Sequence, residues 1–103
     1  MIMKYLTFFI ILLSSPLYAV DLVSSRYTCT HKDNDLVRQV EIIHKDPGCQ
    51  VNYTKAVGTV NEATRTLWRA KNSTEYCEDK GKAFVEEKLQ RKFGWVCLDQ
   101  IKN

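Results

Sequence analysis

The chain has 103 residues, of which 45% are hydrophobic and 26% are charged, with only 4 Gly and 2 Pro. These values exclude collagen-like, low-complexity and largely disordered chains, and the length corresponds to a single domain. The formal net charge of +3 is too small to indicate nucleic-acid binding on its own.

The first nineteen residues have the pattern of a secretory signal peptide. Lys4 supplies a positive charge, residues 5–13 form an apolar run interrupted only by Thr7, and Ala19 precedes the expected cleavage site. The run is shorter than the roughly 20 residues that span a bilayer, although an uncleaved anchor on the membrane surface is an alternative. We therefore predict a signal peptide (1–19) and one disulfide-containing domain (20–103), located in the periplasm or, alternatively, secreted from the cell.

All four cysteines, Cys29, Cys49, Cys77 and Cys97, follow the predicted cleavage site. An even number of cysteines in an oxidising compartment indicates disulfides, here two. No two cysteines have the close C-x-x-C spacing of zinc and redox sites. The cysteines are therefore expected to be structural.

Alternating apolar residues and turn signals predict four strands, at residues 26–31, 36–45, 49–57 and 65–71. Asp46-Pro47-Gly48 is a strong turn signal between the second and third strands. Short connections make consecutive strands antiparallel neighbours. The expected core residues from the strands and the helix described next are Tyr27, Val40, Ile42, Val51, Tyr53, Leu67, Phe84, Val85 and Leu89.

The remainder of the chain reads as one helix. We expect Asn72 to be its N-cap and Gly94 to end it. Cys77, Gly81 and Leu89 fall on one apolar face, and Gly81 suggests a close approach of the helix to the sheet. The predicted fold class is α+β: a four-stranded antiparallel β-meander with one C-terminal α-helix packed on a face, and two disulfides.

This layout also predicts the disulfide pairing. Cys29 and Cys49 lie roughly 20 Å apart along the sheet at about 3.3 Å per residue, too far for a bond. Cys77 and Cys97 lie at opposite ends of the helix. The fourth strand returns to the Cys49 end before the helix begins, so we predict Cys49–Cys77 and Cys29–Cys97.

The sequence contains no recognised catalytic motif and no cofactor-binding motif. His31 and His44 are expected at opposite ends of the sheet, which argues against a shared metal site. We predict a protein that is not an enzyme and has neither a metal nor a cofactor. Arg65, Arg69 and Lys71 flank Trp68, so these four residues are a candidate patch for binding an anionic partner; alternatively, Leu67 or Trp68 packs inward while Arg69 faces water.

Seven short segments of the chain form a combined pattern: Tyr27-x-Cys29, Arg38-x-Val40-Glu41, Cys49-x-Val51-x-Tyr53, Leu67-Trp68-Arg69-Ala70-x-Asn72, Tyr76-Cys77, Phe84-Val85 and Gly94-Trp95-x-Cys97. Together they resemble small, largely uncharacterised exported proteins of Gram-negative bacteria. The resemblance implies the compartment and the fold but no functional residue. The chain is also more loosely similar to periplasmic inhibitors of C-type lysozyme, although residues 58–64 lack the Ser/Gly pattern of their inhibitory loop and the helix departs from their all-β build.

The sequence therefore favours a small periplasmic or secreted module that is non-catalytic and has a binding or structural role. The expected partner is another envelope or extracellular protein, without nucleic acid and without stable membrane insertion after signal cleavage. Two alternatives are an inhibitor of lysozyme or another cell-wall hydrolase, and a small accessory subunit of an envelope secretion or pilus assembly.

Overall fold

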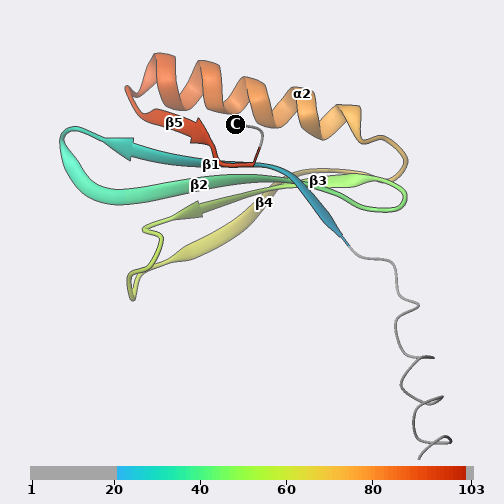
Figure 1. Ribbon diagram of the computed structural model, residues 1–103, viewed down its shortest axis with the longest axis horizontal. Coiled ribbons are helices and arrows are strands. Elements are labelled where there is room, and N and C mark those ends of the chain that lie inside the picture. Colours follow the sequence, from blue (N-terminus) through green and yellow to red (C-terminus); the bar gives the residue numbers. More distant parts are fainter. Residues whose placement is uncertain (1–20, 102–103) are drawn as a thin grey trace, which may run out of the picture.

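A computed structural model describes residues 21–101; the predicted signal peptide lies outside the described residues. The elements in chain order are β1 (Leu22–His31), β2 (Asn34–His44), β3 (Cys49–Lys55), β4 (Ala63–Ala70), α2 (Glu75–Ala83), η1 (Phe84–Lys92) and β5 (Val96–Asp99). The strands form one antiparallel sheet in the order β4-β3-β2-β1-β5, and the helical layer crosses one face of it (Figure 1). The α+β class with a C-terminal helix is as predicted.

The prediction of four strands was wrong, because the chain adds β5 after the helix. This strand pairs antiparallel with the outer edge of β1, with Cys97 opposite Cys29. It has only four residues and none of them is buried, so it is too short to be recognised in the sequence from alternation. The fifth strand leaves β4 and β5 as the two sheet edges.

The helix begins later than predicted. Its first residue is Glu75 and its N-cap position is Thr74, not Asn72, with no capping hydrogen bond from the Thr74 side chain. The Ser73 hydroxyl instead accepts a hydrogen bond from the Tyr76 backbone N–H at 3.1 Å. From Phe84 the backbone hydrogen bonds join residues five apart, which is the π-helical pattern. Gly94, at φ +77°, ends the helix as predicted.

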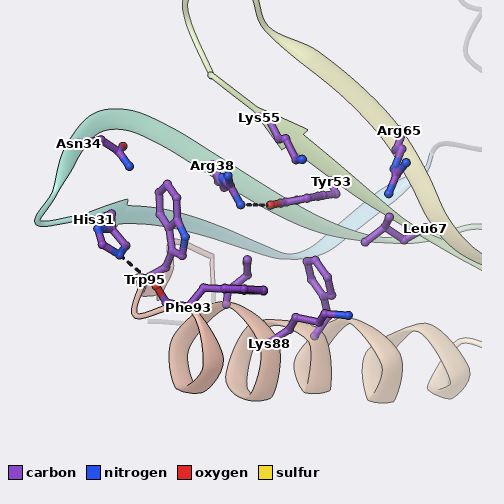
Figure 2. A pocket seen from close by; sticks show the side chains of 12 residues that line it. His31, Asn34, Arg38, Tyr53, Lys55, Arg65, Leu67, Lys88, Phe93 and Trp95 are labelled. Atoms are coloured by element: carbon purple, nitrogen blue, oxygen red, sulfur yellow. Dashed lines mark hydrogen bonds between the residues drawn. The ribbon is translucent and has the colours of Figure 1, made fainter.

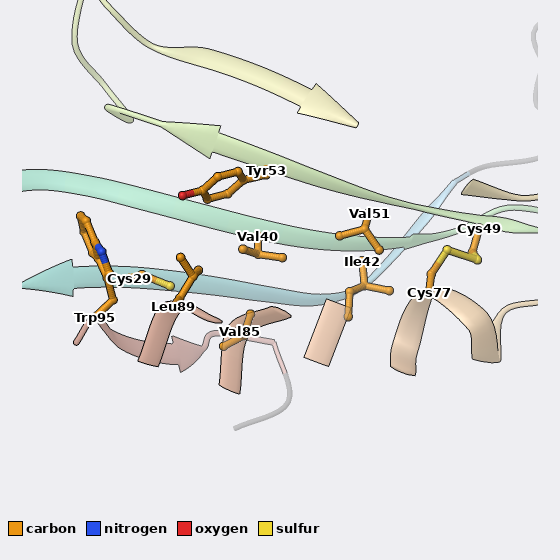
Figure 3. Packing of buried hydrophobic residues seen from close by; sticks show 10 residues of the cluster. All are labelled: Cys29, Val40, Ile42, Cys49, Val51, Tyr53, Cys77, Val85, Leu89 and Trp95. Carbon is orange, nitrogen blue, oxygen red and sulfur yellow. A yellow bond between two sulfur atoms is a disulfide. The ribbon is translucent and has the colours of Figure 1, made fainter. Parts of the chain in front are cut away.

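Two disulfides lie at the two ends of the core, and they are the pairs that the strand layout predicts. Cys49–Cys77 joins β3 to the helical layer, whereas Cys29–Cys97 joins the neighbouring strands β1 and β5. Between them the buried side chains come from both layers (Figure 3). The fully buried apolar residues outside the bridges are Val40, Ile42, Val51, Val85 and Leu89, with Tyr53 and Trp95 nearly so. Tyr27, Leu67 and Phe84 are only half-buried against this core, and Trp95 is a core residue that the sequence did not suggest.

Gly81 lies where the helix approaches the sheet most closely. A Cβ atom there would lie 2.7 Å from Cδ1 and 2.8 Å from Cγ1 of Ile42, and Ile42 is fully buried. Gly81→Ala is therefore expected to lower the free energy of unfolding by about 1–2 kcal/mol despite the better helix propensity of Ala. Lys82→Ala, at the exposed neighbouring position, should change it by less than about 0.5 kcal/mol. Urea unfolding followed by circular dichroism measures both, and equal effects would contradict the close contact.

Candidate functional site

A groove opens between the sheet and the C-terminal half of the helical layer (Figure 2). Its volume is about 540 Å³, which is within the range of small-ligand sites. We call it the basic groove, and it is defined by twelve lining residues: His31, Asn34, Arg38, Tyr53, Lys55, Arg65, Leu67, Phe84, Lys88, Leu89, Phe93 and Trp95. Four of them are Arg or Lys, four are Phe, Tyr or Trp, and none is acidic.

Arg38 is the central cation of the basic groove. It lies two residues before Val40 in β2, on the same face of the strand as Val40 and Ile42, so its side chain points toward the helix. Its guanidinium carbon lies 4.4 Å from the centre of the Trp95 ring, and its Nη1 donates a hydrogen bond of 2.6 Å to the Tyr53 hydroxyl. Arg38 is half-buried, and stacking on an indole together with one hydrogen bond restricts its side chain.

His31 holds the end of the groove in place. The Asp33 backbone N–H donates to its Nδ1 at 3.0 Å, so that nitrogen is the acceptor. Its Nε2 then carries the proton and donates to the Phe93 carbonyl at 3.0 Å. The ring also meets Trp95 edge-on, with centroids 5.1 Å apart. His31 therefore positions the segment that brings Trp95 over Arg38.

Within the part of the chain that the structure describes, no ion pair joins a cation of the basic groove to a carboxylate. The ion pairs among residues 21–101 are Arg26–Glu41 and Lys45–Asp21, and the rings of His31 and His44 also lie beside the carboxylates of Asp33 and Glu78. None of these pairs includes Arg38, Lys55, Arg65 or Lys88. Several cations around one concave site raise its positive electrostatic potential, which attracts anions. The aromatic rings of the groove provide apolar contact surface next to these cations.

The structure separates the four residues of the predicted binding patch. Arg65 lines the basic groove, and Trp68 is half-buried with its ring 5.8 Å from that of Phe84. Arg69 lies opposite Gln50 in the β3–β4 register. Because Cys49 and Val51 on either side of Gln50 face the helix, Gln50 and Arg69 point to the opposite face of the sheet, where Arg69 is exposed. Lys71 follows the end of β4. The four therefore do not form one surface.

The sequence analysis missed the residues that make the basic groove, namely Arg38, Lys55, Lys88 and Trp95. One signal was present: Arg38 continues the inward-facing alternation of Val40 and Ile42, where a cation is unusual unless it is paired or functional. Trp95 gave no such signal, because its place depends on the turn after the helix and on β5.

A second polar cluster lies at the other end of the helical layer. The Ser24 hydroxyl donates to Glu78 Oε2 at 2.5 Å, and His44 Nε2 lies 2.8 Å from the same oxygen. Both groups thus meet a helix carboxylate rather than each other, and the cluster ties α2 to β1 and β2. Nearby, burial raises the pKa of the Tyr27 phenol, with a smaller contribution from Asp99, so Tyr27 is neutral at pH 7.

Within residues 21–101, no group of three or more His, Cys, Asp or Glu side chains is arranged to hold a metal ion. None of the helices described there is long and apolar enough to cross a bilayer. Comparisons with protein-family models, curated proteins and solved structures give no significant match to this chain.

Proposed function

We propose that this protein is a small exported, non-catalytic binding module, and that its basic groove holds an anionic group of a partner protein. The observation that carries this proposal is Arg38: a half-buried guanidinium stacked on Trp95, hydrogen-bonded to Tyr53 and without a carboxylate partner among the described residues. A partly desolvated cation among other cations is unfavourable in the free protein. A bound carboxylate would relieve that repulsion and accept the remaining guanidinium donors.

Arg38→Gln is expected to weaken binding of a carboxylate probe by about tenfold or more, since a charge-assisted hydrogen bond contributes roughly 1.5–3 kcal/mol. The probe is glutamate blocked at both ends, for which we expect a dissociation constant on the order of 1 mM. Isothermal titration calorimetry and chemical shifts of backbone amides measure the binding.

Arg69→Gln is the matched control, because it removes the same charge from the exposed opposite face of the sheet. It should change the affinity by less than about twofold, as surface charges contribute little at physiological salt. Equal weakening by both substitutions would mean that the probe responds to overall charge, and absence of binding would contradict the proposal.

Export is the second part of the proposal. It is supported by the apolar run before Ser14 and by the pairing of all four cysteines, since disulfides persist in oxidising compartments. N-terminal sequencing of the protein from its native cells should begin at Val20. A cytosolic protein with residues 1–19 intact and four free thiols would contradict export.

A second candidate function, inhibition of lysozyme or another cell-wall hydrolase, is favoured by the loop between β3 and β4. This loop projects away from the helical layer (Figure 1). It is held by hydrogen bonds from the Gly58 N–H to Glu62 Oε1 (2.7 Å) and from the Thr59 hydroxyl to the Ala56 carbonyl (2.8 Å), while Val60 at its tip is fully exposed. An ordered loop with an apolar tip suits insertion into a cleft. A lysozyme assay tests this: absence of inhibition at micromolar protein removes the candidate.

A further inference from the structure

A second cavity of about 580 Å³ adjoins the basic groove and shares four of its lining residues, Arg65, Leu67, Phe84 and Lys88. In Figure 2, Arg65 and Leu67 lie at the end of the basic groove opposite His31. We call the second cavity the outer lobe. It continues along the gap between β4 and the helical layer, so the two cavities form one elongated site.

The helical side of the outer lobe is a row of cations. Lys80, Lys88 and Lys92 line it, at multiples of four residues along the helix, and Phe84 occupies the remaining position of the same row. None of these three lysines takes part in an ion pair within residues 21–101. One carboxylate, that of Glu87, also lines the lobe. The cationic surface of the basic groove therefore extends well beyond Arg38.

The two cavities also share a continuous aromatic wall. The Phe84 ring lies 5.0 Å from that of Tyr53 in the basic groove and 5.8 Å from that of Trp68 in the outer lobe, edge-on in both cases. A ligand that crosses from one cavity to the other must therefore pass over Phe84. It would meet apolar rings between the positions where it meets cations.

We propose that the occupant is an extended acidic segment of the partner protein, in which acidic and apolar side chains are interleaved. Side chains on one face of an extended peptide repeat about every 6–7 Å, and positions four residues apart on a helix are separated by roughly 6 Å at 1.5 Å per residue. A face that reads acidic, apolar, acidic, acidic can therefore place carboxylates at Lys80, Lys88 and Lys92 and an apolar side chain at Phe84. A purely ionic polymer would leave the rings of Phe84 and Trp68 without apolar contact. This inference rests on the proposed function and names the class of partner for the same site.

The test compares the end-blocked glutamate with the end-blocked octapeptide Glu-Ser-Leu-Ser-Glu-Ser-Glu-Ser. In the extended form one face of this peptide reads Glu, Leu, Glu, Glu. By linking several weak contacts, the octapeptide should bind about 100-fold more tightly than the single residue. Lys80→Gln combined with Lys92→Gln should weaken the octapeptide about fivefold, as expected for two exposed ion pairs, and should leave the single residue within about twofold. Calorimetry at physiological salt measures each affinity.

The matched control is Lys82→Gln combined with Arg91→Gln, which removes the same charge from exposed positions of the same helical layer that line neither cavity. This control should leave both affinities unchanged. If blocked glutamate binds through Arg38 but the octapeptide binds no more tightly, the inference fails while the proposed function stands. If a sulfated octasaccharide binds more tightly than the octapeptide with the same variant pattern, the occupant is a glycan and the inference is overturned. If neither glutamate probe binds, both proposals fail.

Discussion

Replacement of Cys29 and Cys97 by alanine is expected to lower the free energy of unfolding by about 4 kcal/mol. The bridge closes a loop between residues 68 positions apart in the sequence, and the entropy of the unfolded chain gained on opening a loop grows with its length. A domain of this size is usually stable by only about 4–12 kcal/mol. The variant should therefore be close to unfolding at 37 °C. Urea unfolding followed by circular dichroism measures the loss.

The Cys49–Cys77 bridge provides the control, because it joins residues only 28 positions apart. Its removal should cost slightly less, about 3.5 kcal/mol, and it lies at the end of the core away from Trp95 (Figure 3). The two variants should differ more in binding than in stability. Without Cys29–Cys97, β5 loses its covalent tie to β1 and Trp95 its support over Arg38. At a temperature where both variants are folded, calorimetry should show weaker anion binding only for the Cys29–Cys97 variant; equal weakening would contradict this division.

The disulfide pairing was predictable because connectivity restricts it strongly. Short turns force antiparallel neighbours, and the register then places Cys49 opposite Ala70, from which the chain enters the helix that carries Cys77. Each step depends on local signals: the alternation of the strands, a turn at Pro47 and Gly48, and the apolar face of the helix. The observed bounds of β2 (Asn34–His44) and β4 (Ala63–Ala70) differ from the predicted ranges, 36–45 and 65–71, by one or two residues at each end.

The site was not predictable in the same way, because it depends on how layers meet. Arg65 and Trp68 lie close in sequence to Arg69 and Lys71, but a bulge in β4 and the pleat distribute them over two faces. The residues that do converge come from β1, β2, β3, β4, the helical layer and the turn before β5. The alternation of β2 marks Arg38 as inward-facing, but the convergence of the other residues on it follows from tertiary packing, for which neither spacing nor composition carries a signal.

Trp95 contributes both to the stability of the domain and to the geometry of the proposed site. Besides removal of the Cys29–Cys97 bridge, Trp95→Ala is expected to lower the free energy of unfolding the most. Its ring is 7% exposed and packs on both Arg38 and His31. Truncation of a buried aromatic side chain to Ala costs about 3–5 kcal/mol, and here it also removes the surface that holds the guanidinium. Urea unfolding should show a loss of about 4 kcal/mol.

Trp95→Phe separates the two roles. A phenyl ring retains most of the apolar contact, so the loss of stability should be roughly 1–2 kcal/mol, with the domain still folded. Phe is a weaker cation–π partner than Trp, so Arg38 should be held less firmly and the end-blocked glutamate should bind about threefold more weakly. Ile42→Val, at a fully buried core position that lines neither cavity, is the control for stability alone. It should cost about 0.5–1.5 kcal/mol and leave the affinity unchanged. If Trp95→Phe destabilises the domain without changing anion affinity, the indole is only a packing element and Arg38 needs no support from it.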